Sequence, residues 1–265
     1  MDNQTVIYEV REQIGWVTLN RMEVMNAISQ EMSAELIEIV RGAENNNDVR
    51  VLVFTGAGEK AFSSGMDLKE RASGRAPSLL ERRRLKTVPG FHTHTQAIAS
   101  MSKPTIAAIR GYALGGGLEI ALACDLRFAT EDSKLGLTEV RLGMIPGSGG
   151  TQRLSRLIGI SKALEMCISG NPVDGREAHR IGLVNSILPP EELLAGVERF
   201  AKSILKGAPL AVRYVKEAIY KGTEISLEQG LRLEADLSAL IATTDDCKEG
   251  PRAFSEKRAP VWKDR

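Results

Sequence analysis

The stretch Gly111–Asp125, GYALGGGLEIALACD, decides the fold. The apolar run Thr105–Ile109 precedes it, three consecutive glycines interrupt its pattern, and a small-residue apolar segment then carries one carboxylate, Glu119. At a predicted strand-to-helix junction, glycines allow a sharp turn and leave bare N–H groups at the new helix N-terminus, where negative charge is stabilised. A lone acid in an apolar helix is costly unless it is paired or used. We therefore interpret this stretch as the floor of an active site.

The composition is typical of a soluble globular protein. The 265 residues are 43% hydrophobic and 26% charged, and the formal net charge of +1 gives no global bias towards nucleic acid. The three cysteines lie far apart without a CxxC pair, which argues against a disulfide scaffold or zinc motif and favours a reducing compartment. The N-terminal sequence is typical of neither a signal peptide nor a transit segment, and the apolar runs are too short to span a membrane. We therefore expect a cytoplasmic protein.

Short apolar strands alternate with helices over residues 1–190, which predicts a layered α/β core. The strand patterns cover 6–10, 15–19, 51–55, 105–109, 126–129 and 134–136, and the helix patterns include 29–42, 151–158 and 161–168. From about Pro189 the strands stop, and helix patterns follow at 191–205, 210–220 and 227–241, the last opened by a capping box of Ser226 and Gln229. This shift predicts a separate helical region over 191–265.

A second isolated acid, Glu139, lies in LGLTEVRLGMIPGSGGTQRL, after a weak strand and before the cluster Gly147, Gly149 and Gly150. Two carboxylates such as Glu119 and Glu139 can divide proton donation and abstraction if their surroundings separate their pKa values. Two capping or surface glutamates would show the same spacing. The residues alone leave both interpretations open.

A third glycine-bearing turn, Ser63-Ser64-Gly65-Met66-Asp67, follows the strand predicted at 51–55. Together with Gly116, this turn can supply two backbone N–H groups that converge on one oxygen, as in an oxyanion hole for an acyl carbonyl. Neither glycine run is a phosphate loop, because no GKS or GKT follows.

Three segments in this order, KAFSSGMDLKE, GYALGGGLEIALACDLRFA and LGLTEVRLGMIPGSGGTQRL, resemble the crotonase family, also called the enoyl-CoA hydratase/isomerase family. The resemblance runs from the NR…NA segment at 20–27 to FSEKR at 254–258. It implies an α/β fold with a ββα spiral core over 1–190 and a helical oligomerisation region over 191–265, with trimers that often pair into hexamers. It also implies an acyl-CoA substrate and neither a metal nor a redox cofactor, since coenzyme A is part of the substrate.

The resemblance assigns the catalytic roles residue by residue. The N–H groups of Met66 and Gly116 would hold the thioester oxygen. Glu119 and Glu139 fill both glutamate positions of the family's hydratases: Glu119 would position and deprotonate the water, and Glu139 would manage the proton delivered to the α-carbon. Gly147 corresponds to a family glycine whose N–H helps to fix the site. These matches predict an enoyl-CoA hydratase, which reversibly adds water to the double bond of a 2-enoyl-CoA.

The predicted substrate contacts lie around the same turns. Lys69 is the best-placed cation for coenzyme A, with Asp67 and Leu68 supplying neighbouring backbone. The remaining predicted contacts are Ser64, Met66, Gly116 and Lys257, with Arg258 beside the last. Lys257 could reach the nucleotide of a neighbouring subunit, or it could be an ordinary surface lysine. Met66 stands where alanine is frequent in the family, and its bulk could crowd the acyl pocket.

Other interpretations of the chain stay open. The segment DLKERA and the EKR tail look most like the methylglutaconyl-CoA hydratase branch. A Δ3-Δ2 enoyl-CoA isomerase and an RNA-binding protein on the same scaffold are further alternatives. The run ERRRLK, with Arg82, Arg83 and Arg84, falls in a predicted surface lid over 77–100 and could bind a distal carboxylate or nucleic acid; a solvated helix face is favoured. We expect His92 and His94 to be exposed rather than metal ligands.

Overall fold

The computed structural model describes residues 4–73 and 93–264. The chain forms two compact units, Met1–Met101 with Thr105–Glu198, and Ser102–Pro104 with Arg199–Arg265. The division falls inside helix α9 (Leu193–Leu205), after the boundary predicted between 190 and 191. Leu193 and Val197, near the start of this helix, are buried and belong to the first unit.

The first unit contains a six-stranded sheet in which the strands follow the order β1-β2-β3-β5-β7-β10. These strands are β1 (Val6–Arg11), β2 (Ile14–Leu19), β3 (Val51–Gly56), β5 (Thr105–Ile109), β7 (Leu126–Ala129) and β10 (Ser186–Ile187). β1 and β2 form the predicted antiparallel hairpin, and every later pair is parallel. β5 is buried along its whole length, as a continuous apolar run predicts for a central parallel strand.

A second sheet of four strands has the order β4-β6-β8-β9. Its strands are β4 (Ala61–Ser63), β6 (Tyr112–Leu114), β8 (Lys134–Gly136) and β9 (Val173–Asp174). The chain goes from β3 to β4, from β5 to β6 and from β7 to β8, so each step adds one strand to each sheet before a helix begins. This repetition confirms the expected ββα spiral.

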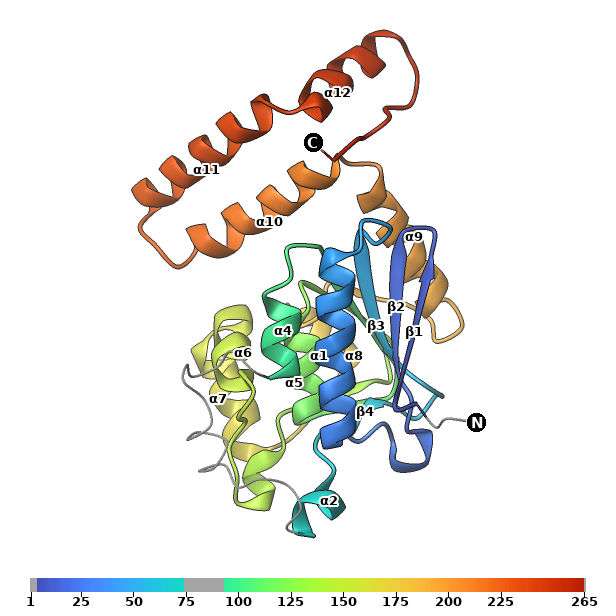
Figure 1. Ribbon diagram of the computed structural model, residues 1–265. Helices are drawn as coiled ribbons and strands as arrows, with labels where there is room; N and C mark the ends of the chain where they lie inside the picture. The colour runs from blue at the N-terminus through green and yellow to red at the C-terminus, as the bar shows by residue number, and fades with distance from the viewer. Residues whose placement is uncertain (1–3, 74–92, 265) are drawn as a thin grey trace. The chain divides into compact units, whose positions relative to one another are not determined.

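Helices pack against the core and against one another: α4 contacts both α1 and α5, and the three are visible together in Figure 1. In the first unit the helical segments are η1 (Met22–Val24), α1 (Gln30–Asn45), α2 (Leu68–Ala72), α4 (His94–Ala99), α5 (Gly116–Ala123), η2 (Glu139–Leu142), α6 (Gly150–Ile158), α7 (Ile160–Ser169) and α8 (Gly175–Arg180). Ser29 caps α1 as expected, because its side chain accepts a hydrogen bond from the Met32 N–H. The helix runs past its predicted end at residue 42, and Ala43 continues its buried face.

In the second unit, α10 (Pro209–Gly222) and α11 (Leu227–Ala242) form a helical hairpin, and α12 (Asp245–Ser255) follows. The predicted capping box of Ser226 and Gln229 is present at the start of α11. The two helices approach closely at Gly222 and Gly230, where a Cβ on Gly230 would lie 3.5 Å from the Gly222 oxygen. The sequence patterns did not predict α12, which contains Pro251.

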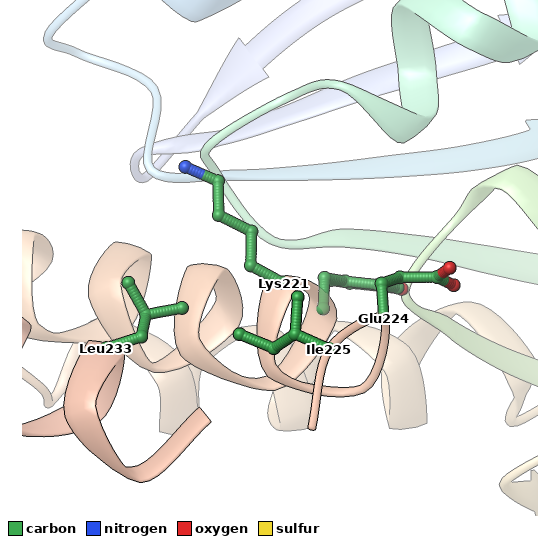
Figure 2. Close-up of a pocket in the computed structure, with 5 residues that line it drawn as sticks. Lys221, Glu224, Ile225 and Leu233 are labelled. Carbon is green, nitrogen blue, oxygen red and sulfur yellow. The ribbon is translucent and has the colours of Figure 1, made fainter. Parts of the chain in front are cut away.

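A hollow of about 580 Å³ opens at the turn of this hairpin. Figure 2 shows the five residues that line it, from the end of α10, the turn and α11, and labels four of them. Its lining residues are Tyr220, Lys221, Glu224, Ile225 and Leu233. None of the residues predicted for the active site lines it.

Candidate active site

The first part of the site is the contact between two backbone turns. Gly65 has a φ of 92°, and a Cβ there would lie 2.7 Å from the Leu114 oxygen and 3.1 Å from the Gly116 nitrogen. The backbone conformation at position 65 disfavours any residue with a side chain, and the neighbouring backbone leaves no room for one. This close approach brings the turn after β4 against the N-terminus of α5.

The N–H groups of Met66 and Gly116 lie at this contact. The backbone on either side of Met66 bonds to Ile28, since Gly65 O accepts from Ile28 N and Asp67 N donates to Ile28 O. A Cβ on Gly116 would lie 3.7 Å from the Met66 nitrogen. Within the described part of the chain, neither the Met66 N–H nor the Gly116 N–H donates a hydrogen bond to another protein group. Two neighbouring donors are thus available to one oxygen, as an oxyanion hole requires.

Glu119 projects from the first turn of α5 and is 3% exposed. Its Oε1 accepts hydrogen bonds from the N–H groups of Ser148 at 2.7 Å and Gly150 at 2.9 Å. Burial raises the pKa of Glu119, and these two donors and the positive charge of Arg153 oppose the rise. Both N–H groups bond to Oε1, and the Ser148 hydroxyl also opposes the rise in the pKa of this carboxyl group.

Glu139 begins η2 and is 9% exposed. A Cβ on Gly115 would lie 3.3 Å from its Oε1, so the carboxyl group lies against the backbone that leads into α5. Its Oε2 is buried, and no hydrogen-bond partner for it occurs in residues 4–73 and 93–264. Burial raises the pKa of Glu139 to about 7; its own backbone N–H opposes the rise, and the negative charge of Glu119 adds to it.

Cys167 on α7 lies within the electrostatic reach of both carboxyl groups. Burial raises the pKa of its thiol, and the charges of Glu139 and Glu119 raise it further. The structure therefore brings together the two acids that the sequence places in different motifs, and it surrounds them with groups that sequence reasoning missed: Ser148, Gly150, Arg153 and Cys167.

Gly147 lies next to this centre. Among the described residues, the hydrogen bonds to Glu119 come from Ser148 and Gly150, and none comes from Gly147. The available signal in the sequence was the whole run GSGG at the start of a helix, because several successive N–H groups there can face one anion.

The residues predicted to contact coenzyme A lie on and before α2. Asp67 caps this helix by accepting from Lys69 N and Glu70 N, and it pairs with Arg21 at 2.9 Å. The Glu70 N–H in particular, together with Arg21, holds the pKa of Asp67 below its usual value. The Asp67 side chain is thus occupied structurally.

The other predicted contacts of this group remain accessible to different degrees. Lys69 and Leu68 are exposed on α2, and Ser64 is half-buried with its hydroxyl towards Val24 O at 3.4 Å. Lys257 is exposed in the second unit, after α12, where its φ is 53°.

The expected exposure of His94 is wrong. His94 is 9% exposed, and its Nδ1 lies 2.7 Å from the Ser33 hydroxyl on α1. The packing of α4 against α1 buries the ring. His92 and the run Arg82, Arg83 and Arg84 lie outside the described residues. Cys124 is buried in the core as expected.

Residues 4–73 and 93–264 contain neither a helix suited to cross a membrane nor a cluster of metal-binding side chains. No helix there has both the length and the apolar character to cross a bilayer. No three His, Cys, Asp or Glu side chains gather there in a way that could hold a metal ion.

The chain is similar to known proteins in both sequence and fold. Residues 9–265 match the sequence model of the family described as enoyl-CoA hydratase/isomerase. A putative enoyl-CoA hydratase/isomerase of Bacillus subtilis is 44% identical over 98% of both chains, and an (E)-benzylidenesuccinyl-CoA hydratase of Thauera aromatica is 41% identical over 97% of this chain and 98% of its own. The crystal structure of an enoyl-CoA hydratase from Bacillus anthracis, 38% identical, has a TM-score of 0.92 and covers 99% of this chain and 100% of its own.

Proposed function

The chain belongs to the enoyl-CoA hydratase/isomerase family, and from that premise we propose that it is an enoyl-CoA hydratase, a hydro-lyase that reversibly adds water to a 2-enoyl-CoA. The observation that carries this proposal is the pair Glu119 and Glu139. They are two buried carboxyl groups in different surroundings, beside two unengaged backbone N–H groups. One acid suited to the charged form and one suited to the neutral form can divide a proton transfer.

The proposed reaction begins at the thioester oxygen. The N–H groups of Met66 and Gly116 bind this oxygen and stabilise the negative charge that develops on it, which makes the β-carbon electrophilic. Glu119 Oε2 takes a proton from the attacking water as the oxygen bonds to the β-carbon. The resulting enolate takes a proton at the α-carbon from Glu139. Hydration leaves Glu119 neutral and Glu139 ionised, and proton exchange restores the starting state.

Coenzyme A binding is assigned to the turn before α2. Lys69 is proposed to meet the anionic part of coenzyme A, with the backbone of Asp67 and Leu68 and the Ser64 hydroxyl nearby; the exposure of Lys69 supports this assignment. Lys257 is proposed to contribute from the second unit, and Gly147 to shape the loop beside Glu119. The reaction needs no cofactor, because coenzyme A enters with the substrate. We also propose that the protein is cytoplasmic and that it acts in fatty acid metabolism.

Self-association is the second part of the proposal. The second unit exposes several large apolar side chains on α10 and α11, which in water would favour burial against another surface. They are Val215, Ile219, Tyr220, Leu227, Leu231 and Leu240. We assign them to contacts between copies of the chain in a trimer or hexamer. Sedimentation of the wild type and of Leu231→Asp tests this, since the substitution should shift the protein towards the monomer.

A hydration assay over an acyl-CoA panel tests the function. The loss of ultraviolet absorbance of the conjugated enoyl thioester should be fast with wild type and should nearly vanish in Glu139→Gln. The panel includes crotonyl-CoA, 3-methylglutaconyl-CoA and a β,γ-enoyl-CoA. Faster conversion of the β,γ-isomer than hydration would make the protein an isomerase. RNA retention that survives Glu139→Gln, without hydration by the wild type, would overturn the enzyme assignment.

A further inference from the structure

The loop that precedes α6 holds the Glu119 carboxylate as a small anion-binding nest. The N–H groups of Ser148 and Gly150 both donate to Glu119 Oε1. Between them lies Gly149, with φ 104° and ψ 2°, which turns the two N–H groups to the same side. A Cβ on Gly150 would lie 3.0 Å from Glu119 Oε1, so this backbone presses directly on the carboxylate.

A glycine-rich loop has few contacts of its own that hold it in one conformation. Gly147, Gly149 and Gly150 have no side chains with which to pack, and glycine-rich backbone loses much conformational freedom when it is ordered. The orientation of the two N–H groups therefore depends on contacts from outside the loop.

Those contacts converge on one atom, the carbonyl oxygen of Ser148. Arg153 Nη1, on α6, donates to it at 2.9 Å, and the Thr95 hydroxyl, on α4, donates to it at 2.9 Å. This carbonyl belongs to the peptide group that lies between the two N–H groups on Glu119. The guanidinium lies over the loop itself, since a Cβ on Gly149 would collide with Arg153 Nη1. Arg153 Nη2 also reaches Gln96 Oε1 at 3.4 Å, which ties α6 to α4.

We propose that Arg153 and Thr95 are positioning residues for the hydration reaction: by holding the Ser148 carbonyl they direct both loop N–H groups to Glu119 Oε1 and keep Oε2 turned to the water. This inference rests on the proposed function. Neither residue bonds to the Glu119 carboxyl group, and each acts through the Ser148 peptide. Arg153 adds a second effect that Thr95 cannot supply, because its positive charge favours the ionised form of Glu119.

Four variants separate these effects. Arg153→Met removes the donor and the charge, Arg153→Lys keeps the charge and a possible donor, and Thr95→Val removes only the hydroxyl. Arg180→Met is the matched control, because Arg180 is an exposed arginine paired with Glu177 on α8. We expect kcat for hydration of crotonyl-CoA to fall about 10- to 100-fold in Arg153→Met and about threefold to tenfold in Thr95→Val, with KM within about twofold of wild type. Arg153→Lys should recover part of the loss, and Arg180→Met should match wild type.

The pH profile distinguishes positioning from general destabilisation. The acidic limb of kcat/KM should move to higher pH in Arg153→Met and stay in place in Thr95→Val, because only the arginine contributes charge. Among the residues that the structure describes, the other titratable groups that interact with Glu119 are Glu139 on η2 and Cys167 on α7, and both stay unchanged in these variants. His94 on α4 is bonded to Ser33 on α1 instead.

A readout that does not need turnover keeps this inference apart from the proposed function. Carbon-13 signals of labelled glutamate should show a higher pKa for Glu119 in Arg153→Met than in wild type. If wild type hydrates enoyl-CoA but Arg153→Met keeps the wild-type kcat and acidic limb, the positioning role is wrong and the hydratase assignment stands. If wild type hydrates nothing on the panel, the hydratase assignment fails. An unchanged pKa of Glu119 in Arg153→Met would then overturn the role of Arg153 as well. If Arg153→Met does not fold, the kcat of Thr95→Val decides, because a wild-type kcat in that variant would overturn the positioning role.

Discussion

The surroundings of Glu119 at the junction of α5 and α6 differ from those of Glu139 in η2, although both side chains are almost fully buried. Glu119 Oε1 receives two backbone N–H groups, whereas Glu139 Oε2 is buried and finds no hydrogen-bond partner in the described chain. Burial raises the pKa of both groups. Two loop N–H groups and the charge of Arg153 oppose the rise at Glu119, whereas at Glu139 its own backbone N–H opposes the rise and the charge of Glu119 adds to it. The difference teaches that the number of donors and the sign of the nearby charge, as well as depth, set the surroundings of the two acids apart.

Physical chemistry gives this difference its direction. A buried carboxylate is costly unless hydrogen bonds replace the lost water, and two N–H groups at a helix start supply that replacement for Glu119. Glu139 has its own backbone N–H as a donor, but its buried Oε2 has no hydrogen-bond partner among the described residues and a second negative charge lies near, so its neutral form is favoured up to a pH of about 7. Under the proposed function, Glu119 would be the base and Glu139 the acid.

The strongest way to break this comparison is to neutralise each acid in turn. Glu119→Gln and Glu139→Gln should each lower kcat by about 10²- to 10⁴-fold, since each removes one proton-transfer group. The double variant should lose much less than the product of the two, because both act in one event. Steady-state kinetics with short-chain enoyl-CoA measures this, with circular dichroism as the folding control. A single variant within tenfold of wild type would refute the shared role.

The next largest effect is the pH dependence of the free energy of unfolding of Glu139→Gln relative to wild type. The folded-state pKa of Glu139 is raised to about 7, so its contribution to stability is fully present below the unfolded-state pKa and is lost as the pH rises through about 7. Relative to wild type, Glu139→Gln should therefore gain stability between about pH 5 and pH 8, by up to about 3 kcal/mol. Urea unfolding at both pH values measures the difference. An equal offset at the two values would show that Glu139 titrates normally.

A substitution in the nest sharpens the comparison from the side of Glu119. In Gly150→Ala, the new Cβ would lie 3.0 Å from Glu119 Oε1, Leu137 Cδ1 and Pro146 Cβ, so the carboxylate must shift. We expect kcat to fall about tenfold with little change in the Glu139 environment. Gly42→Ala is the control, because nothing lies within 4 Å of a Cβ there in helix α1. It should keep full activity and gain about 0.5–1 kcal/mol of stability. Equal activity of the two variants would show that the nest does not position Glu119.

Much of the fold was predictable because its signals are local. An apolar run marked β5, and two short strand patterns marked β7 and β8, all with their observed bounds. Three glycine-bearing motifs indicated the turns that meet at the site. The helix α12 was not predicted, because Gly250 and Pro251 interrupt its pattern.

The site was predictable in its acids but not in what controls them. Ser148 and Gly150 donate to Glu119 through their backbone N–H groups. Arg153 and Thr95 both bond to the Ser148 carbonyl, and Thr95 lies on α4, a helix far from this loop in the sequence. No periodicity in the sequence reports which side of a glycine loop its N–H groups face. His94 was misjudged for a similar reason, since its burial depends on the packing of α4 against α1.

The central claim, that Glu119 and Glu139 act with one proton between them, is tested most directly by the pH dependence of kcat/KM. Because the singly protonated pair serves both directions, hydration and dehydration should show the same alkaline limb. We predict that both rates fall about tenfold per pH unit above a pH of about 7, where Glu139 loses its proton. A kcat/KM that stays constant from about pH 6 to about pH 9 would contradict the claim.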